Sequence, residues 1–222
     1  CNYEVTRAAA PDFIVRKFEG KYLKESDAGA IIELGKKMDS VLIGPGLGEH
    51  EESISTVVRI LNELHIPTVL DASGMLALKE IKKFPLQQPV VVTPHNNEFQ
   101  HLVDRDVLVK EDDPKSVILL RSLSMDLHIN VLLKSAVDFV SSDEGLVEKN
   151  LTGNAGMTVG GSGDVLAGVV ASFMAQGLEG FDAARCAAFV VGRAGDLLFK
   201  EKGVCYTASE IAEMVGVAVN KL

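Results

Sequence analysis

The sequence predicts an α/β fold with a mainly parallel central sheet, for three reasons. Short runs rich in Val, Ile and Leu alternate along the chain with longer amphipathic segments. These short runs are almost continuously apolar, which is typical of strands that are covered on both faces. Strands and helices follow each other in turn and several helices close the chain, an order that favours crossover connections in a parallel sheet.

The strand candidates are the short apolar runs. They are Phe13–Phe18, Val41–Ile43, Thr68–Leu70, Val90–Thr93, Val131–Lys134 and Phe139–Ser141. Ligands bind an α/β sheet of this kind at the carboxyl ends of its strands. The Gly-, Asn- and Asp-rich segments that directly follow strands are therefore expected to be functional. These segments are Gly44–Gly48, Asp71–Gly74 and Thr93–Glu98.

The helix candidates are identified from their start signals. A helix over 26–37 opens with Ser26 as its N-cap, and a helix over 49–64 carries three Glu residues in its first turn. Asp113 followed by Pro114 is a typical N-cap and first helical residue. An apolar helix is expected over 165–176. For the last helix, Thr207 and Glu210 fit a capping box.

Composition limits the cellular partners of the chain. It has 222 residues and a formal net charge of −9, and its length suits a single domain over 1–222. The acidic balance argues against nonspecific binding to nucleic acid or to anionic membranes, and no apolar stretch is long enough to span a bilayer. Three scattered cysteines, Cys1, Cys186 and Cys205, do not form a disulfide framework, so we expect a cytoplasmic protein.

The segment over 43–48 reads Ile-Gly-Pro-Gly-Leu-Gly and lies between a strand and a helix. Gly44, Gly46 and Gly48 would let the backbone approach a ligand closely. Their G-x-G-x-G spacing differs from the G-x-G-x-x-G of dinucleotide-binding turns, so a tight turn without a ligand is an equal alternative. Asp71, which ends the next strand, either faces a substrate or caps the helix that follows.

The segment over 92–98 reads Val-Thr-Pro-His-Asn-Asn-Glu and joins a strand to a helix. His95 could bind a substrate or donate to an oxyanion, and Glu98 could hold a Mg²⁺-bound water. The alternative is an ordinary helix start, with Asn96 as its cap and Glu98 in its first turn. Lys134, at another strand end, either reaches a phosphate or forms an ion pair.

The glycine-rich stretch over 151–168 is the strongest candidate for a functional site. A glycine-rich loop at a helix N-terminus is an anion cradle, because its N–H groups converge and the helix dipole favours phosphate. Asp164 lies at the N-terminus of this helix, where a carboxylate would repel a bound phosphate. We therefore interpret Asp164 as a base that takes a proton from a hydroxyl attacking phosphorus. The alternative, a helix cap beside packing glycines, is disfavoured by the five glycines: Gly153, Gly156, Gly160, Gly161 and Gly163.

Five motifs, taken in order, resemble the ADP- or ATP-dependent NAD(P)H-hydrate dehydratase family of the ribokinase-like superfamily. They are Gly-Pro-Gly-Leu-Gly from 44, Leu-Asp-Ala from 70, Thr-Pro-His-x-x-Glu from 93, Leu-Lys from 133, and Gly-Asn-x-Gly-Met-x-x-Gly-Gly-Ser-Gly-Asp from 153. The resemblance runs from about Pro11 to Val219. It implies a three-layer α/β/α sandwich, and an oligomer of identical subunits. It also implies a lyase that repairs the hydrated cofactors NADHX and NADPHX with ADP or ATP and Mg²⁺.

The resemblance also implies roles for individual residues. Asp164 would be the catalytic base, and Gly46, Gly48 and His95 would line the substrate site with it. Phosphorylation of the ring hydroxyl would turn a poor leaving group into a good one, and the amides of the glycine loop would stabilise the charge that develops. The nucleotide would be held by Lys134, Ser135, Ala136, Val137, Asp138, Asn154, Gly160, Gly161, Ser162 and Gly163.

The chain departs from the family pattern in three places. Ser162 replaces a Thr and keeps its hydroxyl. The family's Lys-Gly-x-x-Thr reads Lys134-Ser-Ala-Val-Asp138, which places a carboxylate where a neutral hydroxyl is expected near the nucleotide. Members usually carry an N-terminal strand and helix with a Gly-Ala segment that contacts the substrate. This chain begins at Cys1 beyond that region, so we expect that its N-terminal segment is missing.

Two other functions fit the same residues. A kinase of a small alcohol would use Asp164 in the same way, but it would leave the phosphoryl group on its product instead of releasing inorganic phosphate. A nucleotide-binding protein without activity would bind its ligand equally well after Asp164→Asn. The motif that contains His95, together with the Gly-Pro-Gly-Leu-Gly segment, favours the dehydratase over sugar kinases.

Overall fold

The computed structural model describes residues 3–9, 12–104, 109 and 113–221. Its centre is a six-stranded sheet whose strands lie side by side in sequence order. β1 to β4 pair in parallel, and β5 and β6 are antiparallel, so the prediction of a mainly parallel sheet is confirmed. The strands are β1 (Val41–Ile43), β2 (Thr68–Leu70), β3 (Val90–Val92), β4 (Asn130–Leu133), β5 (Asp138–Ser141) and β6 (Val147–Asn150).

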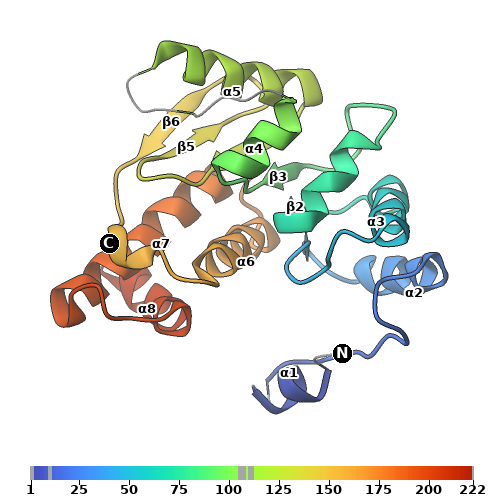
Figure 1. Ribbon diagram of the computed structural model, residues 1–222, viewed down its shortest axis with the longest axis horizontal. Helices are drawn as coiled ribbons and strands as arrows, with labels where there is room; N and C mark the ends of the chain where they lie inside the picture. Colours follow the sequence, from blue (N-terminus) through green and yellow to red (C-terminus); the bar gives the residue numbers. More distant parts are fainter. Residues whose placement is uncertain (1–2, 10–11, 105–108, 110–112, 222) are drawn as a thin grey trace.

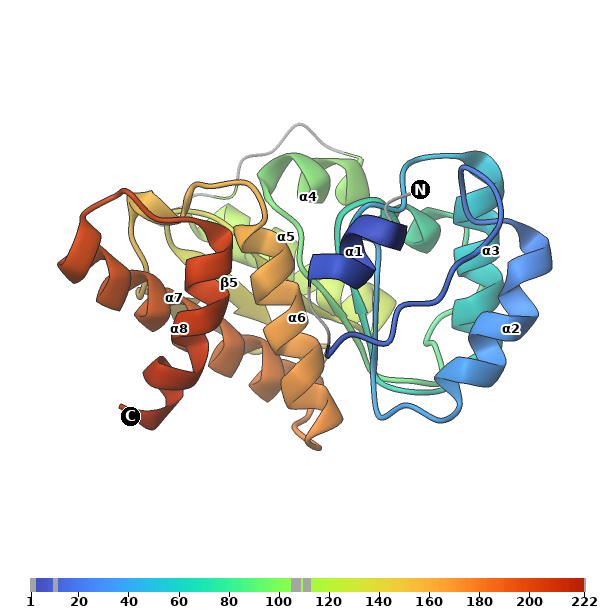
Figure 2. The same cartoon turned by 90° about the horizontal axis from the view of Figure 1, so that it is seen from below.

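Helices cover both faces of this sheet and make a three-layer sandwich (Figure 1). One face carries α3 (Glu51–Glu63), the 3-10 helix η1 (Ala72–Lys79), α4 (Asn96–Val103) and α5 (Pro114–Leu127). The other carries α6 (Ser162–Ala175), α7 (Gly180–Lys202) and α8 (Ala208–Asn220). The remaining helices are α1 (Tyr3–Ala9), which buries no residue, α2 (Glu25–Gly35) and the 3-10 turn η2 (Ala155–Met157). The second view shows α2 and α3 side by side (Figure 2).

Each face of the sheet has its own apolar core, because successive side chains of a strand point to opposite faces. Val69, Val91 and Leu132 pack against α6, α7 and α8. Leu70, Val90 and Val92 pack against α3, η1, α4 and α5. The sheet-facing side of α7 is built largely of small residues, which lets this helix lie close to the strands: Ala183, Ala184, Ala187, Ala188 and Ala194.

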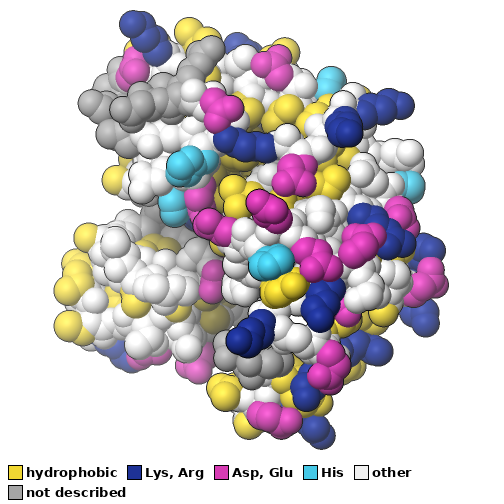
Figure 3. All heavy atoms as spheres, turned by 45° about the vertical axis from the view of Figure 1, so that its right-hand side comes forward, with side chains coloured by type: hydrophobic (Ala, Val, Ile, Leu, Met, Phe, Trp, Pro, Cys, Tyr) yellow, Lys and Arg dark blue, Asp and Glu magenta, His cyan; other side chains and the backbone are white. Residues whose placement is uncertain are grey.

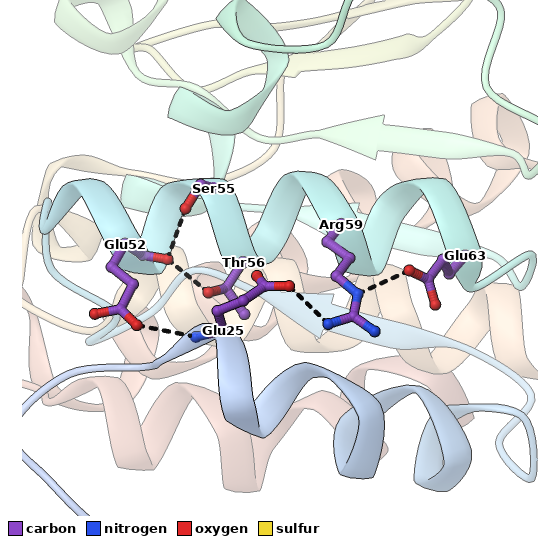
Figure 4. A network of polar contacts seen from close by, with 6 residues as sticks. All are labelled: Glu25, Glu52, Ser55, Thr56, Arg59 and Glu63. Carbon is purple, nitrogen blue, oxygen red and sulfur yellow. Dashed lines mark hydrogen bonds and ion pairs between the residues drawn. The ribbon is translucent and has the colours of Figure 1, made fainter.

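Polar contacts fix α2 to the surface of α3. Arg59 on α3 donates to Glu25 on α2 at 2.6 Å and to Glu63 on its own helix at 2.8 Å. The backbone N–H of Glu25 donates to Glu52 at 3.3 Å (Figure 4). These pairs are solvent-exposed, so each contributes at most about 1 kcal/mol, and the buried Ala28, Ile32, Ile60 and Leu64 carry most of the packing.

One strand prediction is wrong, and one strand was not predicted. The run over 13–18 forms no strand: it has no regular secondary structure and pairs with no described strand, and Phe13 and Ile14 are 61% and 91% exposed. An apolar run becomes a strand only where a neighbour accepts its backbone hydrogen bonds. Conversely, β6 (Val147–Asn150) was not predicted, because the adjacent charged residues Glu148 and Lys149 give it little apolar character.

Helix starts also differ from the predictions. α2 is capped by Lys24 and not by Ser26, and its first residue is Glu25. α3 begins at Glu51 because His50 is its N-cap, two residues after the predicted start. The Asp113 cap with Pro114, and the Thr207–Glu210 capping box, are confirmed.

Two general expectations can be compared with the described residues. None of the helices in the described ranges combines the length and apolarity that a bilayer crossing requires. Cys186 and Cys205 are free thiols, and Cys1 lies outside the described residues. Acidic and basic side chains are interspersed over the face seen in Figure 3.

Candidate functional site

The segments that follow β1 and β2 lie in direct contact at the carboxyl edge of the sheet. Gly44 has a φ of +134°, and a Cβ built on it would lie only 1.7 Å from the backbone oxygen of Asp71. A Cβ on Gly74 would lie 2.4 Å from the backbone oxygen of Ile43. Any larger residue would force these two connections apart. Gly44 is therefore needed for packing, whereas Gly46 and Gly48 have open space where a side chain would be.

Asp71 neither caps a helix through its side chain nor faces open solvent. It precedes η1 without a side-chain cap bond, and its side chain is 3% exposed. Its Oδ1 accepts from Thr93 Oγ1 at 2.7 Å and from Lys134 Nζ at 2.8 Å. The structure therefore does not bear out the helix-cap interpretation of Asp71 and shows its side chain as the buried partner of an ion pair.

Lys134 lies at the centre of the site and connects three segments. Its backbone N–H donates to the oxygen of Pro94 at 2.8 Å, and it forms an isolated parallel bridge with His95. Its Nζ, paired with Asp71, lies 3.2 Å from the position that a Cβ on Gly163 would occupy. The carboxyl ends of β2, β3 and β4 thus meet the glycine-rich loop at the ammonium group of Lys134.

His95 is the N-cap of α4 and Glu98 completes a capping box with it. His95 Nδ1 accepts from the Glu98 N–H at 3.1 Å, and Glu98 Oε2 accepts from the His95 N–H at 2.8 Å. Asn96, the cap expected from the sequence, instead accepts from the Val109 N–H at 3.1 Å. The imidazole of His95 remains 53% exposed, so the capping residue still presents its ring to solvent.

The glycine-rich loop leads directly into α6. Gly161 caps this helix with a φ of +94°, a conformation that L side chains rarely adopt. Ser162 and Gly163 are the first helical residues, where backbone N–H groups have no acceptor within the helix. Asp164 follows in the first turn with its side chain exposed. The loop therefore ends in a helix N-terminus with an exposed carboxylate beside it, and a helix N-terminus is the kind of backbone arrangement that can bind an anion.

The segment over 134–138 turns from β4 into β5. Asp138 accepts from the backbone N–H of Ser135 at 3.0 Å and from Asn150 Nδ2 at 3.1 Å. Burial raises the pKa of the Asp138 carboxyl above its usual value, and these two hydrogen bonds together with Lys134 offset only part of that rise. Ser135 and Ala136 are exposed, and Val137 is half-buried.

Asn154, in contrast, is surrounded by protein groups. Its Oδ1 accepts from Tyr206 Oη at 2.6 Å and from the Gly156 N–H at 3.0 Å, and its Nδ2 donates to Asp196 at 3.2 Å. Asp196 and Tyr206 were not predicted from the sequence. The one available signal is the Gly-x-x-Gly-Asp pattern that ends at Asp196, which places small residues and a carboxylate on one face of α7.

A cavity of about 150 Å³ lies beside these residues. It is lined by Glu98 and His101 of α4, by Lys79 of η1 and by Glu49, which follows the Gly44–Gly48 segment. A second cavity of about 490 Å³ lies between β6 and the α6–α8 layer and is lined by Phe173 and Phe189. The predicted site residues do not line this second cavity.

Comparison with known proteins identifies the family. The model of the NAD(P)H-hydrate dehydratase family matches residues 1–216. A bifunctional NAD(P)H-hydrate repair enzyme of Methanothermobacter thermautotrophicus is 38% identical over 94% of this chain, and the matched region is 40% of that enzyme. The chain thus spans well under half the length of such bifunctional relatives. An ADP-dependent (S)-NAD(P)H-hydrate dehydratase of Nitrosopumilus maritimus is 31% identical, over 95% of this chain and 72% of that protein.

Solved structures confirm the fold. The ADP/ATP-dependent NAD(P)H-hydrate dehydratase of Bacillus subtilis, co-crystallized with ATP and Mg²⁺, superposes with a TM-score of 0.72 at 23% identity, over 85% of this chain and 68% of that one. A ribokinase-like superfamily protein of Enterococcus faecalis gives a TM-score of 0.77 at 23% identity, over 99% and 74%. The ribokinase-like three-layer fold is therefore confirmed, and by its sequence the chain belongs to the NAD(P)H-hydrate dehydratase family.

Proposed function

We propose that this chain catalyses the nucleotide-dependent dehydration of (S)-NAD(P)H hydrate to NAD(P)H. The observation that carries the proposal is the approach of Lys134 to Gly163 beside the exposed carboxylate of Asp164. This arrangement offers a cation and helix amides to a phosphoryl group, with a base next to them. The names of the relatives, which describe repair of the same hydrate, support the proposal.

The proposed reaction has two steps. Asp164 takes the proton of the ring hydroxyl while the hydroxyl oxygen attacks the terminal phosphorus of ADP or ATP, and the bond to the departing nucleotide oxygen breaks. The amides of Gly160 to Gly163 stabilise the charge on the transferred phosphoryl group. The ring nitrogen then pushes out inorganic phosphate, and loss of a proton from the neighbouring ring carbon restores the dihydropyridine double bond.

The two ligands are assigned to different parts of the site. Gly46 and Gly48 leave open space above β1, and His95 presents an exposed ring, so these residues together with Asp164 would line the (S)-NAD(P)H hydrate site. The nucleotide site would comprise the 134–138 segment and the glycine-rich loop. Its residues are Lys134, Ser135, Ala136, Val137, Asp138, Asn154, Gly160, Gly161, Ser162 and Gly163.

Mg²⁺ would be held mainly by nucleotide phosphates, with Glu98 contributing through a water. One oxygen of Glu98 accepts from the His95 N–H, which leaves its other carboxylate oxygen for a Mg²⁺-bound water. This donor set fits a cation that keeps most of its waters. Glu98→Gln keeps the capping box, so it should raise the Mg²⁺ concentration needed for half-maximal activity while stability stays within about 0.5 kcal/mol.

The wider organisation is also proposed from the family. We treat 1–222 as a single domain that works as a homo-oligomer in the cytoplasm, where the free thiols of Cys186 and Cys205 would stay reduced. Size-exclusion chromatography with light scattering would test the oligomer. A monomeric mass at micromolar concentration would contradict it.

The decisive experiment follows recovery of dihydronicotinamide absorbance from NADHX with Mg²⁺ and either ADP or ATP. Asp164→Asn should lower the rate about 10²- to 10⁴-fold and leave nucleotide binding largely intact. Asp182→Asn is the matched control, because Asp182 holds the equivalent first-turn position of α7 and is exposed. Phosphate retained on the product would identify a kinase. Nucleotide binding without any turnover would identify a binding protein.

A further inference from the structure

The connection between β6 and α6 lies directly on the surface of α7. A Cβ on Gly192 would lie 2.1 Å from Thr152 Oγ1, and a Cβ on Gly195 would lie 2.4 Å from Met157 Sδ. Both helix positions are buried, and a larger residue at either one would push the connection away. The connection over 152–157 therefore packs closely on α7, and it precedes the Gly160–Gly163 part of the glycine-rich loop by only a few residues.

Asp196 lies one residue beyond this pair of glycines and uses both of its carboxylate oxygens on the connection. Oδ1 accepts from Asn154 Nδ2 at 3.2 Å, and Oδ2 accepts from the backbone N–H of Gly153 at 3.3 Å. A carboxylate is the side chain that can accept at both points from this position. An Asn at 196 would have to present an N–H₂ group to one of the two donors.

Tyr206 holds the same amide from the opposite side. Its Oη donates to Asn154 Oδ1 at 2.6 Å, and the residue is only 6% exposed. A Cβ on Gly156 would lie 2.8 Å from its ring, so the two are in close contact. Burial raises the pKa of the Tyr206 phenol, so the phenol keeps its proton and acts as the donor. With Asp196 accepting and Tyr206 donating, the Asn154 amide has one permitted orientation.

We propose that Asp196 and Tyr206 are positioning residues that hold the Asn154 connection, and through it the glycine-rich loop, in the nucleotide-binding conformation. The proposal rests on the proposed function, since it concerns the same nucleotide site. It also gives Asn154 a structural role, because its side-chain oxygen accepts hydrogen bonds from Tyr206 and from the Gly156 N–H. Apparent nucleotide affinity falls in proportion to the fraction of molecules in which the loop is correctly placed.

The test compares Asp196→Asn and Tyr206→Phe with the wild-type chain. Amide hydrogen exchange over 151–163 should become at least about tenfold faster in Asp196→Asn, because the lost bond involves a charged acceptor. The Kd for ADP, measured by calorimetry, should rise about tenfold, and in the repair assay the KM for nucleotide should rise with kcat changed less than about threefold. Tyr206→Phe should change the same quantities in the same direction.

A matched control and a rescue separate positioning from general destabilisation. Asp182→Asn makes the same chemical change at an exposed site on α7 and should leave exchange over 151–163 unchanged. The double variant Asn154→Asp, Asp196→Asn restores the pattern, because the new amide at position 196 can accept from the Gly153 N–H and donate to the new carboxylate at position 154. Its exchange over 151–163 should return to within about threefold of wild type.

Three results would overturn the proposal. The first is that Asp196→Asn has the same ADP affinity and the same amide exchange over 151–163 as Asp182→Asn. Another is exchange that accelerates throughout the chain in both single variants. The third is a double variant that exchanges as fast as Asp196→Asn alone. The exchange measurement needs no turnover, so a wild-type chain that fails to repair NADHX would reject the proposed function and leave this test intact.

Discussion

The ammonium of Lys134 lies 2.8 Å from Asp71 Oδ1, and this ion pair links the carboxyl ends of β2 and β4 beneath the glycine-rich loop. The Asp71 side chain is 3% exposed and that of Lys134 is 19% exposed. Removing one partner of such a pair leaves a buried charge, whereas removing both does not. The stability of the sheet edge and the positive charge of the proposed nucleotide site therefore depend on the same lysine.

Lys134→Met should destabilise the protein by about 3 kcal/mol or more, because Asp71 is left buried without a counterion. The double variant Asp71→Asn, Lys134→Met should recover much of this loss, since Asn can still accept from Thr93. Urea unfolding curves measure both differences. ADP affinity should stay low in both variants, because the cation is absent in each. A cost below about 1 kcal/mol for Lys134→Met alone would show that the pair behaves like a surface pair.

Gly163→Ala should separate helix stability from nucleotide binding. A Cβ at 163 would lie 3.2 Å from Lys134 Nζ, which is tight and forces the ammonium group to move. Helix propensity favours Ala over Gly by about 0.5–1 kcal/mol, so we expect stability to hold while ADP affinity falls several-fold. Gly168→Ala is the matched control on the same helix, because nothing lies within 4 Å of its Cβ. Equal ADP affinity in the two variants would contradict the assigned role of Lys134.

His95 combines a structural role with a proposed binding role, and substitution can separate the two. Asn is a preferred N-cap residue, so His95→Asn should keep the start of α4 and change the free energy of unfolding by less than about 0.5 kcal/mol. His95→Ala should cost about 1 kcal/mol, because the Glu98 N–H loses its acceptor. If the exposed ring contacts the substrate, both variants should raise the KM for NADHX. An unchanged KM in His95→Asn would leave His95 as a cap alone.

The sequence predicts the sheet and the region of the site because apolar runs and glycines carry strong local signals. Val41–Ile43 and Thr68–Leu70 are strands as predicted, and the glycine-rich loop leads into α6. The failed strand over 13–18 and the missed β6 share one cause. Strand formation depends on a neighbour to pair with, which a single sequence does not contain.

Side-chain partners in the site could not be predicted for a related reason. His50 and His95 both cap helices, although histidine is not among the preferred N-cap residues. The partners of Asn154 come from residues 42 and 52 positions away in the chain. Such contacts arise only when α7 and α8 pack on the sheet, so they depend on tertiary structure and leave little trace in local spacing.

Asp138 should make the protein less stable as the pH rises, which is the opposite of the usual effect of an Asp in a folded protein. Burial raises the pKa of its carboxyl in the folded state, so between the unfolded value of about 3.8 and the folded pKa the native state binds more protons than the unfolded state. Stability therefore falls as the pH rises through this window. Above it, the ionised carboxylate opposes folding and lies in the proposed nucleotide site, where it would repel phosphates.

Asp138→Thr restores the hydroxyl that the family pattern carries at this position and removes the titrating group. The free energy of unfolding of this variant relative to wild type should increase as the pH rises from about 3.5 to neutrality, and at neutral pH its ADP affinity should be several-fold higher. Urea unfolding at a series of pH values, with calorimetry at pH 7.5, measures both quantities. Asp143→Thr, in the exposed turn between β5 and β6, is the control and should show neither change. A stability difference that is independent of pH would show that Asp138 ionises in the folded protein as it does in the unfolded chain.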